Sequence, residues 1–208
     1  MPSLHGPFSM EDTLRFRMKI ELRKRMRAVR ATFPPRARSE RSTQIVARLI
    51  DIEPLSRARN IALFFPIATH GEVELSPLES VLRARGARIA YPRLIPSEPS
   101  AMEFRFVTDV ERMVDHRLGM REPSADEPLA APGELDAIVV PALAADCRGH
   151  RIGYGAGFYD RALPRYAPPA LTIAVIFDFQ LLVEVPCGDH DVAVDWVVTD
   201  TRTIRAER

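Results

Sequence analysis

The sequence is poor in cysteine and has almost no excess of charge. Its 29 Lys and Arg residues nearly balance 28 Asp and Glu residues, and a net charge of +1 gives no general reason to expect nucleic acid or a membrane surface as a partner. Cys147 and Cys187 lack metal-ligand spacing, and so few cysteines indicate a reducing compartment rather than a disulfide-bonded scaffold. We therefore interpret both cysteines as small buried fillers.

Long apolar runs are also missing. No stretch approaches the roughly 18 apolar residues of a membrane span, and no signal-peptide core occurs near the N-terminus. We expect a cytoplasmic protein. Neither internal repeats nor a linker between two domains can be found, so residues 1–13 are expected to be a flexible leader and residues 14–208 a single α/β domain. We expect this domain to be monomeric.

Apolar periodicity predicts helices that alternate with strands. Residues 14–30 and 38–50 have helical spacing, and in the first of these Met18, Leu22, Met26 and Val29 recur on one face. Strands are predicted at residues 61–65, 88–91, 102–107, 137–140, 171–177 and 196–199, and short helices at residues 76–85 and 158–163, the latter limited by Pro164. Several strands are wholly apolar, which predicts an α/β layered domain with a largely parallel sheet flanked by helices.

Polar segments follow several of the predicted strands. Residues 65–72, Arg93, the glycine-rich residues 153–157 and the segment after Phe177 all lie near or beyond strand ends. In parallel sheets, ligands bind beyond the carboxyl ends of the strands. We therefore expect these segments to converge on one crevice.

The segment Gly153-Tyr-Gly-Ala-Gly157 is the most distinctive part of the chain. It lacks the Gly-Lys-Ser/Thr ending of a P-loop and the glycine spacing of a dinucleotide fingerprint. Its alternate glycines suit a loop whose free N–H groups cradle a phosphate, although a tight turn without a ligand is the alternative. Charged neighbours favour phosphate: Arg148, Arg151, Asp160 and Arg161.

The helix predicted at residues 14–30 carries a dense row of basic side chains. Such a row is often simply a solvated face, and this alternative stays open. A second alternative is that the Lys and Arg side chains reach a polyphosphate. Nucleic-acid binding is a third, which we consider weaker because no stacking aromatic residues or known motif accompany the basic row.

Four segments together resemble the 5-formyltetrahydrofolate cyclo-ligase family. They are Lys19-Ile-Glu-Leu-Arg23, Phe65-Pro with Glu72, the run Arg151-Ile-Gly-Tyr-Gly-Ala-Gly-Phe-Tyr-Asp-Arg161, and Asp191. The resemblance covers the chain from residue 19 to the last predicted strand. It implies a compact α/β domain of the cyclo-ligase (CoA-transferase-like) type. It also implies an enzyme that uses ATP and Mg²⁺ to convert 5-formyltetrahydrofolate into 5,10-methenyltetrahydrofolate, ADP and phosphate.

The same resemblance assigns roles to individual residues, and it requires no covalent nucleophile. The implied ATP contacts are Lys19, Arg23, Arg151, Ile152, Gly153, Tyr154, Gly155, Ala156, Gly157, Phe158 and Tyr159. The implied folate contacts are Phe65, Glu72, Tyr154, Gly155, Ala156, Gly157 and Phe158, and the implied metal ligands are Asp160 and Asp191. For Phe65, core packing is an equal alternative, and Asp191 could be a surface aspartate in a polar loop.

The chain departs from the family pattern in the spacing between Pro66 and Glu72, which is longer. Ala142 and Phe158 also stand where the family commonly has glycine and tyrosine. These departures leave room for an alternative function: a cyclo-ligase-like paralogue that binds a nucleotide or related heterocycle for regulation or salvage.

Overall fold

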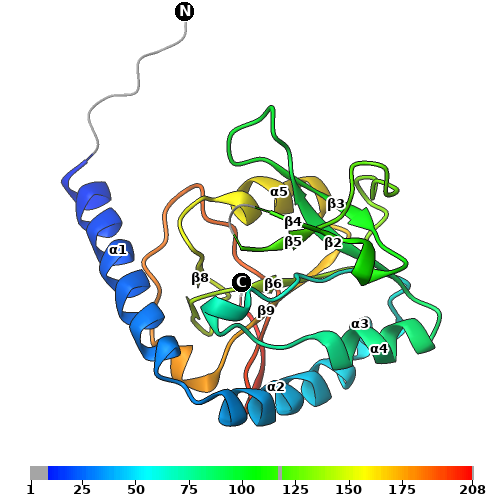
Figure 1. Cartoon of the computed structure of the whole chain (residues 1–208). Helices are drawn as coiled ribbons and strands as arrows, with labels where there is room; N and C mark the ends of the chain where they lie inside the picture. The colour runs from blue at the N-terminus through cyan, green and yellow to red at the C-terminus, as the bar shows by residue number, and fades with distance from the viewer. Residues whose placement is uncertain (1–8, 117–118, 208) are drawn as a thin grey trace, which may run out of the picture.

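The computed structural model describes residues 9–116 and 119–207, and its centre is a seven-stranded sheet in the order β11–β10–β9–β6–β1–β2–β3 (Figure 1). The five inner strands run parallel, and the outer strands β3 and β11 run antiparallel to their neighbours. The strands are β1 (Asn60–Ala62), β2 (Arg88–Leu94), β3 (Met102–Phe106), β6 (Ala137–Pro141), β9 (Leu171–Val175), β10 (Trp196–Val198) and β11 (Thr203–Arg205). The predicted α/β fold with a largely parallel sheet is confirmed.

Helices cover both faces of this sheet. The helices are α1 (Met10–Ala31), α2 (Pro35–Ile50), α3 (Glu53–Arg57), α4 (Ser76–Ala84) and α5 (Phe158–Tyr166), with 3-10 turns η1 (Ala68–His70), η2 (Val110–Arg112) and η3 (Asp178–Gln180). Figure 1 shows α2, α3 and α4 on one side of the sheet, α5 on the other, and α1 standing beside it. Two small hairpins complete the fold: β4 (Val114–Asp115) with β5 (Arg121–Glu122), and β7 (Ala144–Ala145) with β8 (Arg151–Ile152).

Alternate side chains of each strand enter two separate hydrophobic cores. Ile61 and Val139 pack with α2, α3 and α4, whereas Ala62, Ile138 and Val140 pack with α5. Strand β6 is therefore buried on both faces, which explains why its sequence is an unbroken apolar run. A third, smaller core joins Met26 of α1 to β7 and β8.

Helix α1 begins four residues before the predicted start. Ser9 caps it: its hydroxyl accepts from the Asp12 N–H at 3.0 Å, and the Asp12 carboxylate accepts from the Ser9 N–H at 3.3 Å. Residues 10–13 of the expected leader are thus helical, while residues 1–8 lie outside the described residues. The capping box and the acidic first turn explain the earlier start.

Several local predictions are wrong. Met18 and Val29, predicted to share one apolar face with Leu22 and Met26, are exposed, because among the described residues of α1 only Met26 and Arg30 are buried. Helix α5 continues past Pro164 to Tyr166, since proline so near the helix end removes a single backbone donor. Cys147 is exposed and Cys187 only partly buried, because both lie in loops rather than in a core.

The outer strand β3 has its free edge covered by the chain. Phe106 N–H donates to the Pro128 carbonyl at 2.8 Å, and Ala130 N–H donates to the Phe104 carbonyl at 2.8 Å. At the opposite edge β11 has only three residues. Within the described residues, no helix is long and apolar enough to cross a membrane.

Candidate active site

A cavity of about 1170 Å³, here called the main cavity, opens at the carboxyl edge of the sheet. From β1 the chain continues to β2 on one side, whereas from β6 it continues to β9 and β10 on the other, so the strand order reverses between β1 and β6. Such a reversal leaves a crevice in which ligands bind. Phe64 and Phe65 after β1 and Pro141 at the end of β6 line the cavity, which places it at this reversal.

The cavity wall includes every residue that the sequence assigned to ATP, folate or metal. They come from α1, from the segment after β1, from residues 151–160 and from the loop that holds Asp191. The structure thus brings together residues more than 100 positions apart in the chain, while their individual roles stay predictions. Two parts of the wall differ in character, a basic end around α1 and an aromatic end around Phe65.

At the basic end, one row of α1 faces the cavity. Lys19, Arg23 and Arg27 recur at every fourth position, so they lie on one side of the helix and all three line the wall. Arg23 Nε donates to the Gly153 carbonyl and Arg27 donates to the Tyr154 carbonyl, both at 3.0 Å. These bonds attach α1 to the glycine loop (residues 153–157). Lys19 and Arg23 are partly buried at the cavity wall, whereas Arg27 is exposed at its margin.

The glycine loop offers its backbone to the cavity. Gly155 and Gly157 have φ values of +110° and +70°, a region that L side chains rarely adopt. No residue lies within 4 Å of the position that a Cβ on Gly153 would take. Among the described residues, none accepts a hydrogen bond from the backbone N–H groups of residues 153–157. Unpaired N–H groups before the first turn of α5 are the arrangement that binds an anion.

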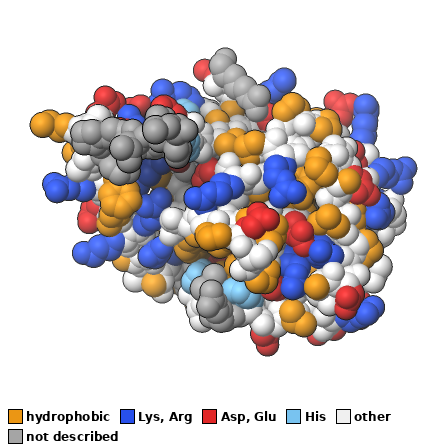
Figure 2. Space-filling view, turned by 90° about the horizontal axis from the view of Figure 1, so that it is seen from above, with side chains coloured by type: hydrophobic (Ala, Val, Ile, Leu, Met, Phe, Trp, Pro, Cys, Tyr) orange, Lys and Arg blue, Asp and Glu red, His pale blue; other side chains and the backbone are white. Residues whose placement is uncertain are grey.

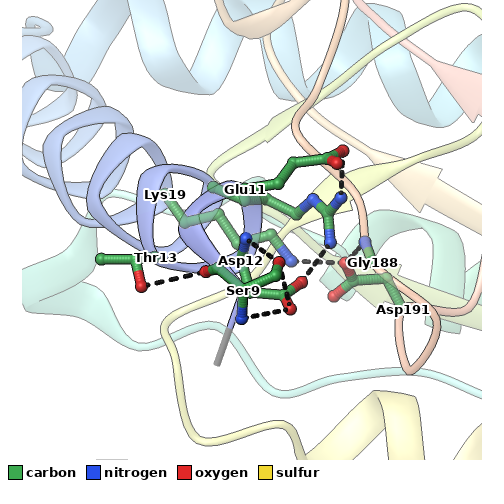
Figure 3. A network of polar contacts seen from close by, with 8 residues as sticks. Ser9, Glu11, Asp12, Thr13, Lys19, Gly188 and Asp191 are labelled. Carbon is green, nitrogen blue, oxygen red and sulfur yellow. Dashed lines mark hydrogen bonds and ion pairs between the residues drawn. The ribbon is translucent and has the colours of Figure 1, made fainter. Parts of the chain in front are cut away.

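Two carboxylates flank this loop. Asp160 Oδ1 accepts from Arg151 at 3.0 Å and from the Val192 N–H at 3.2 Å, so it lies against the residue that follows Asp191. The Asp191 carboxylate accepts from Gly188 N–H at 2.6 Å and pairs with Lys19, as Figure 3 shows beside the capped first turn of α1.

This pair of carboxylates fits a magnesium ion that is carried with phosphates. The described residues contain no group of three or more His, Cys, Asp or Glu side chains placed to hold a metal. Magnesium commonly takes one or two carboxylates and completes its six positions with water and phosphate oxygens. Asp160 and Asp191 would be those ligands, and the ion would compete with the present pairs to Arg151 and Lys19.

At the aromatic end, Phe65 and Glu72 both reach the cavity. Phe65 packs against the core as well as lining the wall, so both of its predicted roles agree with its position. Glu72 is buried; its Oε2 accepts from the Ile67 N–H and its Oε1 accepts from the Tyr154 hydroxyl, both at 2.8 Å. Burial, with Glu72 adding to the effect, raises the pKa of Tyr154, so its hydroxyl stays protonated and donates.

Arg30 belongs to the basic row of α1, for which a solvated face was one open alternative, and it lies beside Glu72 and Tyr154. It is only 3% exposed and lies 3.9 Å from Glu72. Its guanidinium donates to the His70 carbonyl at 2.8 Å, to the Ala142 carbonyl at 3.2 Å and to the Tyr154 hydroxyl at 2.6 Å. Its spacing of four from buried Met26 was the one signal that could have revealed it.

The prediction that all strand-end segments converge is wrong for two of them. Arg93 does not line the main cavity; it lies 3.6 Å from Glu122 and donates to the Pro123 carbonyl. The segment after Phe177 instead borders a second cavity of about 590 Å³. Strands β9 and β10 lie on the far side of β6 from the reversal, so their carboxyl ends open elsewhere.

The outer surface near α1 mixes side-chain types. Figure 2 shows hydrophobic and basic side chains interspersed on the α1 side of the face seen from above. Leu14, Phe16 and Ile20 of α1 are exposed hydrophobic residues in this helix.

Comparison with known proteins gives one consistent result. The model of the 5-formyltetrahydrofolate cyclo-ligase family matches residues 15–200. The 5-formyltetrahydrofolate cyclo-ligase of Escherichia coli K12 is 29% identical over 179 residues, 85% of this chain and 97% of that protein. That of Mycolicibacterium smegmatis is 48% identical over 97 residues, which are 46% of this chain and 50% of that protein.

Among solved structures, 5,10-methenyltetrahydrofolate synthetase from Aquifex aeolicus superimposes with a TM-score of 0.79 at 28% sequence identity, covering 92% of this chain and 94% of that chain. The 5,10-methenyltetrahydrofolate synthetase from Mycoplasma pneumoniae has a TM-score of 0.71 at 22% identity, covering 88% of this chain and 98% of that chain, which shows the shared fold.

Proposed function

The chain belongs to the 5-formyltetrahydrofolate cyclo-ligase family, and we propose that it is an enzyme that closes the ring of 5-formyltetrahydrofolate to 5,10-methenyltetrahydrofolate with consumption of ATP. The observation that supports this most directly is that one cavity joins a basic, glycine-lined end to an aromatic end. At about 1170 Å³ it exceeds the roughly 300–1000 Å³ of a typical ligand pocket, which suits two co-substrates held together.

The proposed reaction has two steps, neither of which forms a bond to the protein. First, the formyl oxygen attacks the γ-phosphorus of ATP, an oxygen–phosphorus bond forms, and ADP leaves. Next, N10 of the folate attacks the formyl carbon, loses its proton, and inorganic phosphate leaves with the former formyl oxygen. The protein therefore has to position two ligands and offset negative charge, which is what phosphoryl transfer requires of an enzyme.

The residues of the basic end suit that task. Lys19, Arg23 and Arg151 provide positive charge, and the free N–H groups of the glycine loop can bind phosphate oxygens. Asp160 and Asp191 would hold Mg²⁺, which when bound with the nucleotide neutralises phosphate charge. The folate ring would lie at the aromatic end, where aromatic side chains can stack on it and Glu72 can accept from an amino group.

An absorbance assay tests this function. Purified protein with 5-formyltetrahydrofolate, ATP and Mg²⁺ should accumulate the methenyl chromophore, and omission of ATP or addition of a chelator should stop it. The matched control is 10-formyltetrahydrofolate, whose formyl group is already on N10 and which offers no N5 formyl oxygen. Nucleotide binding without chromophore formation would contradict the proposal and favour a cyclo-ligase-like binding module.

A further inference from the structure

His70 occupies a distinctive position in the main cavity. It ends the 3-10 turn η1 in the segment between Pro66 and Glu72, and its partly buried side chain lines the cavity wall. The resemblance that assigned roles to Phe65 and Glu72 gave none to this residue.

The backbone and the ring of His70 are both fixed in place. Its carbonyl accepts from Arg30 Nε at 2.8 Å, and Arg30 is itself buried. Its ring stacks on the ring of Tyr154, with 4.7 Å between ring centroids and 24° between ring planes. Tyr154 in turn donates to Glu72. Two aromatic rings and a carboxylate are therefore held as one unit on this wall.

Hydrogen-bonding capacity within this unit is unevenly used. Both Glu72 oxygens accept from protein donors, and the Tyr154 hydroxyl both donates and accepts. In contrast, Nδ1 of His70 has no hydrogen-bond partner among the described residues. A buried polar nitrogen without a partner is unfavourable, so it is usually explained by a ligand, a water molecule or a functional role.

We propose that His70 is a specificity-determining residue whose imidazole hydrogen-bonds a polar edge atom of a flat heterocyclic substrate bound at the aromatic end. This proposal rests on the proposed function, in which that heterocycle is the pterin ring of 5-formyltetrahydrofolate. A pterin carries donors and acceptors along its edge, and a neutral imidazole has one nitrogen of each kind to match them.

The charge around His70 favours the neutral form. Burial lowers the pKa of His70; Glu72 opposes that effect, and Arg30 and Arg27 add to it. The groups around the ring are thus two arginines of α1, the carboxylate of Glu72 and the neutral Tyr154. At neutral pH the ring therefore keeps an acceptor nitrogen, which imidazolium lacks.

Substitution of His70 by Phe separates recognition from packing, because phenylalanine can keep the stack on Tyr154 but has no nitrogen. The KM for 5-formyltetrahydrofolate should rise about three- to tenfold, which corresponds to one lost neutral hydrogen bond. The KM for ATP should change less than twofold. Thr69→Ala, an exposed position on the same turn, is the matched control and should behave as wild type.

A titration of the wild-type protein gives a readout independent of turnover. Imidazole signals of His70, assigned by their absence in His70→Phe, should shift as 5-formyltetrahydrofolate is added without ATP. An unchanged folate KM in the variant, an equal rise of both KM values, or unmoved signals at saturating folate would each overturn the inference. Absence of turnover in the wild type would instead overturn the proposed function. The titration would still show whether 5-formyltetrahydrofolate binds next to His70.

Discussion

Two hollows open at the carboxyl edge of the same sheet, and they employ similar residue types in different ways. In the second cavity, Asp178 accepts from the hydroxyls of Thr199 and Thr201 and pairs with Arg202. Asp200 there accepts from the Asp178 N–H at 2.7 Å. Both carboxylates of this cavity are therefore satisfied by neighbouring protein groups, as expected of a structural junction.

The main cavity contains the same kinds of groups but leaves some of their capacity open. Its glycine-loop N–H groups and the His70 Nδ1 have no partner among the described residues. The location at a strand end is common to both hollows, so location alone does not indicate function. The difference is the unpaired polar groups, and these occur where the strand order reverses.

The largest effect is expected from the carboxylates. Asp160→Asn should lower kcat/KM at least about 100-fold, because it removes an anionic oxygen from the proposed cation site while keeping the side-chain shape. Steady-state kinetics with circular dichroism of both proteins would measure this. Asp178→Asn, a carboxylate of the second cavity, is the matched control and should retain near wild-type activity. Full activity in Asp160→Asn would refute the metal assignment.

The buried arginine should matter next, chiefly for stability. Arg30→Met should cost about 3–5 kcal/mol in the free energy of unfolding, because Glu72 loses its ion-pair partner and three acceptors lose a donor inside the protein. Urea denaturation would show it. The double variant Arg30→Met with Glu72→Gln should lose less than the two single losses added together. If Arg30→Met alone costs less than about 1 kcal/mol, the buried contacts of Arg30 contribute little to stability. If the double-variant loss equals the sum of the single losses, Arg30 and Glu72 are not energetically coupled.

A smaller effect should distinguish Gly153, beside which the cavity is open, from Gly149, beside which the folded chain is closely packed. Gly153→Ala adds a methyl group with no neighbour within 4 Å, so the midpoint of thermal unfolding should stay the same. If phosphate approaches this backbone, the KM for ATP should rise about tenfold. In Gly149→Ala, by contrast, the new Cβ would lie 2.2 Å from the Val194 carbonyl oxygen, and folding should suffer. An unaltered ATP KM in Gly153→Ala would place the nucleotide elsewhere.

The smallest effect concerns the second cavity and depends on pH. Burial alone would raise the pKa of Asp178, but hydrogen bonds from Thr201 and Thr199 and the charge of Arg202 lower it below the ordinary 3.8. Its stabilising contribution is thus fully present above the unfolded-state pKa and is lost as the pH falls through the folded-state pKa. Asp178→Asn should cost up to about 1 kcal/mol at pH 7, since the carboxylate is partly exposed and pairs with the exposed Arg202.

Urea unfolding at pH 7 and near pH 3 would follow this loss. The difference between wild type and Asp178→Asn should shrink at the lower pH. A difference that is the same at both values would show that the carboxylate charge contributes nothing there.

The sheet could be predicted from the sequence because its inner strands are buried on both faces. The apolar run at residues 137–140 predicted β6 to within one residue. The strand predicted at residues 88–91 begins where β2 begins. The two-residue strands β7 and β8 gave no such signal, since they pair only because the chain folds back at Asp146–Gly149. Such short pairings depend on tertiary contacts rather than on periodicity.

The site residues that belong to sequence motifs could be predicted, whereas those outside the motifs could not. Lys19, the glycine loop and Asp160 share one wall, as their strand-end and motif positions indicated. Arg30 could not be separated from the rest of the basic row, because its spacing of four from Met26 is a weak signal; contacts of α1 with η1, Ala142 and Tyr154 bury it. His70 was overlooked for a similar reason, since its stack on Tyr154 joins residues distant in sequence.

The covered edge of β3 and the short β11 also affect how copies of this chain meet one another. A strand at the border of a sheet ordinarily exposes main-chain donors and acceptors to which another polypeptide can add. Here residues 128–130 already bond to one border, and the other offers only three residues, two of them exposed. A sheet with so apolar an interior is thereby protected at its margins against edge-to-edge aggregation.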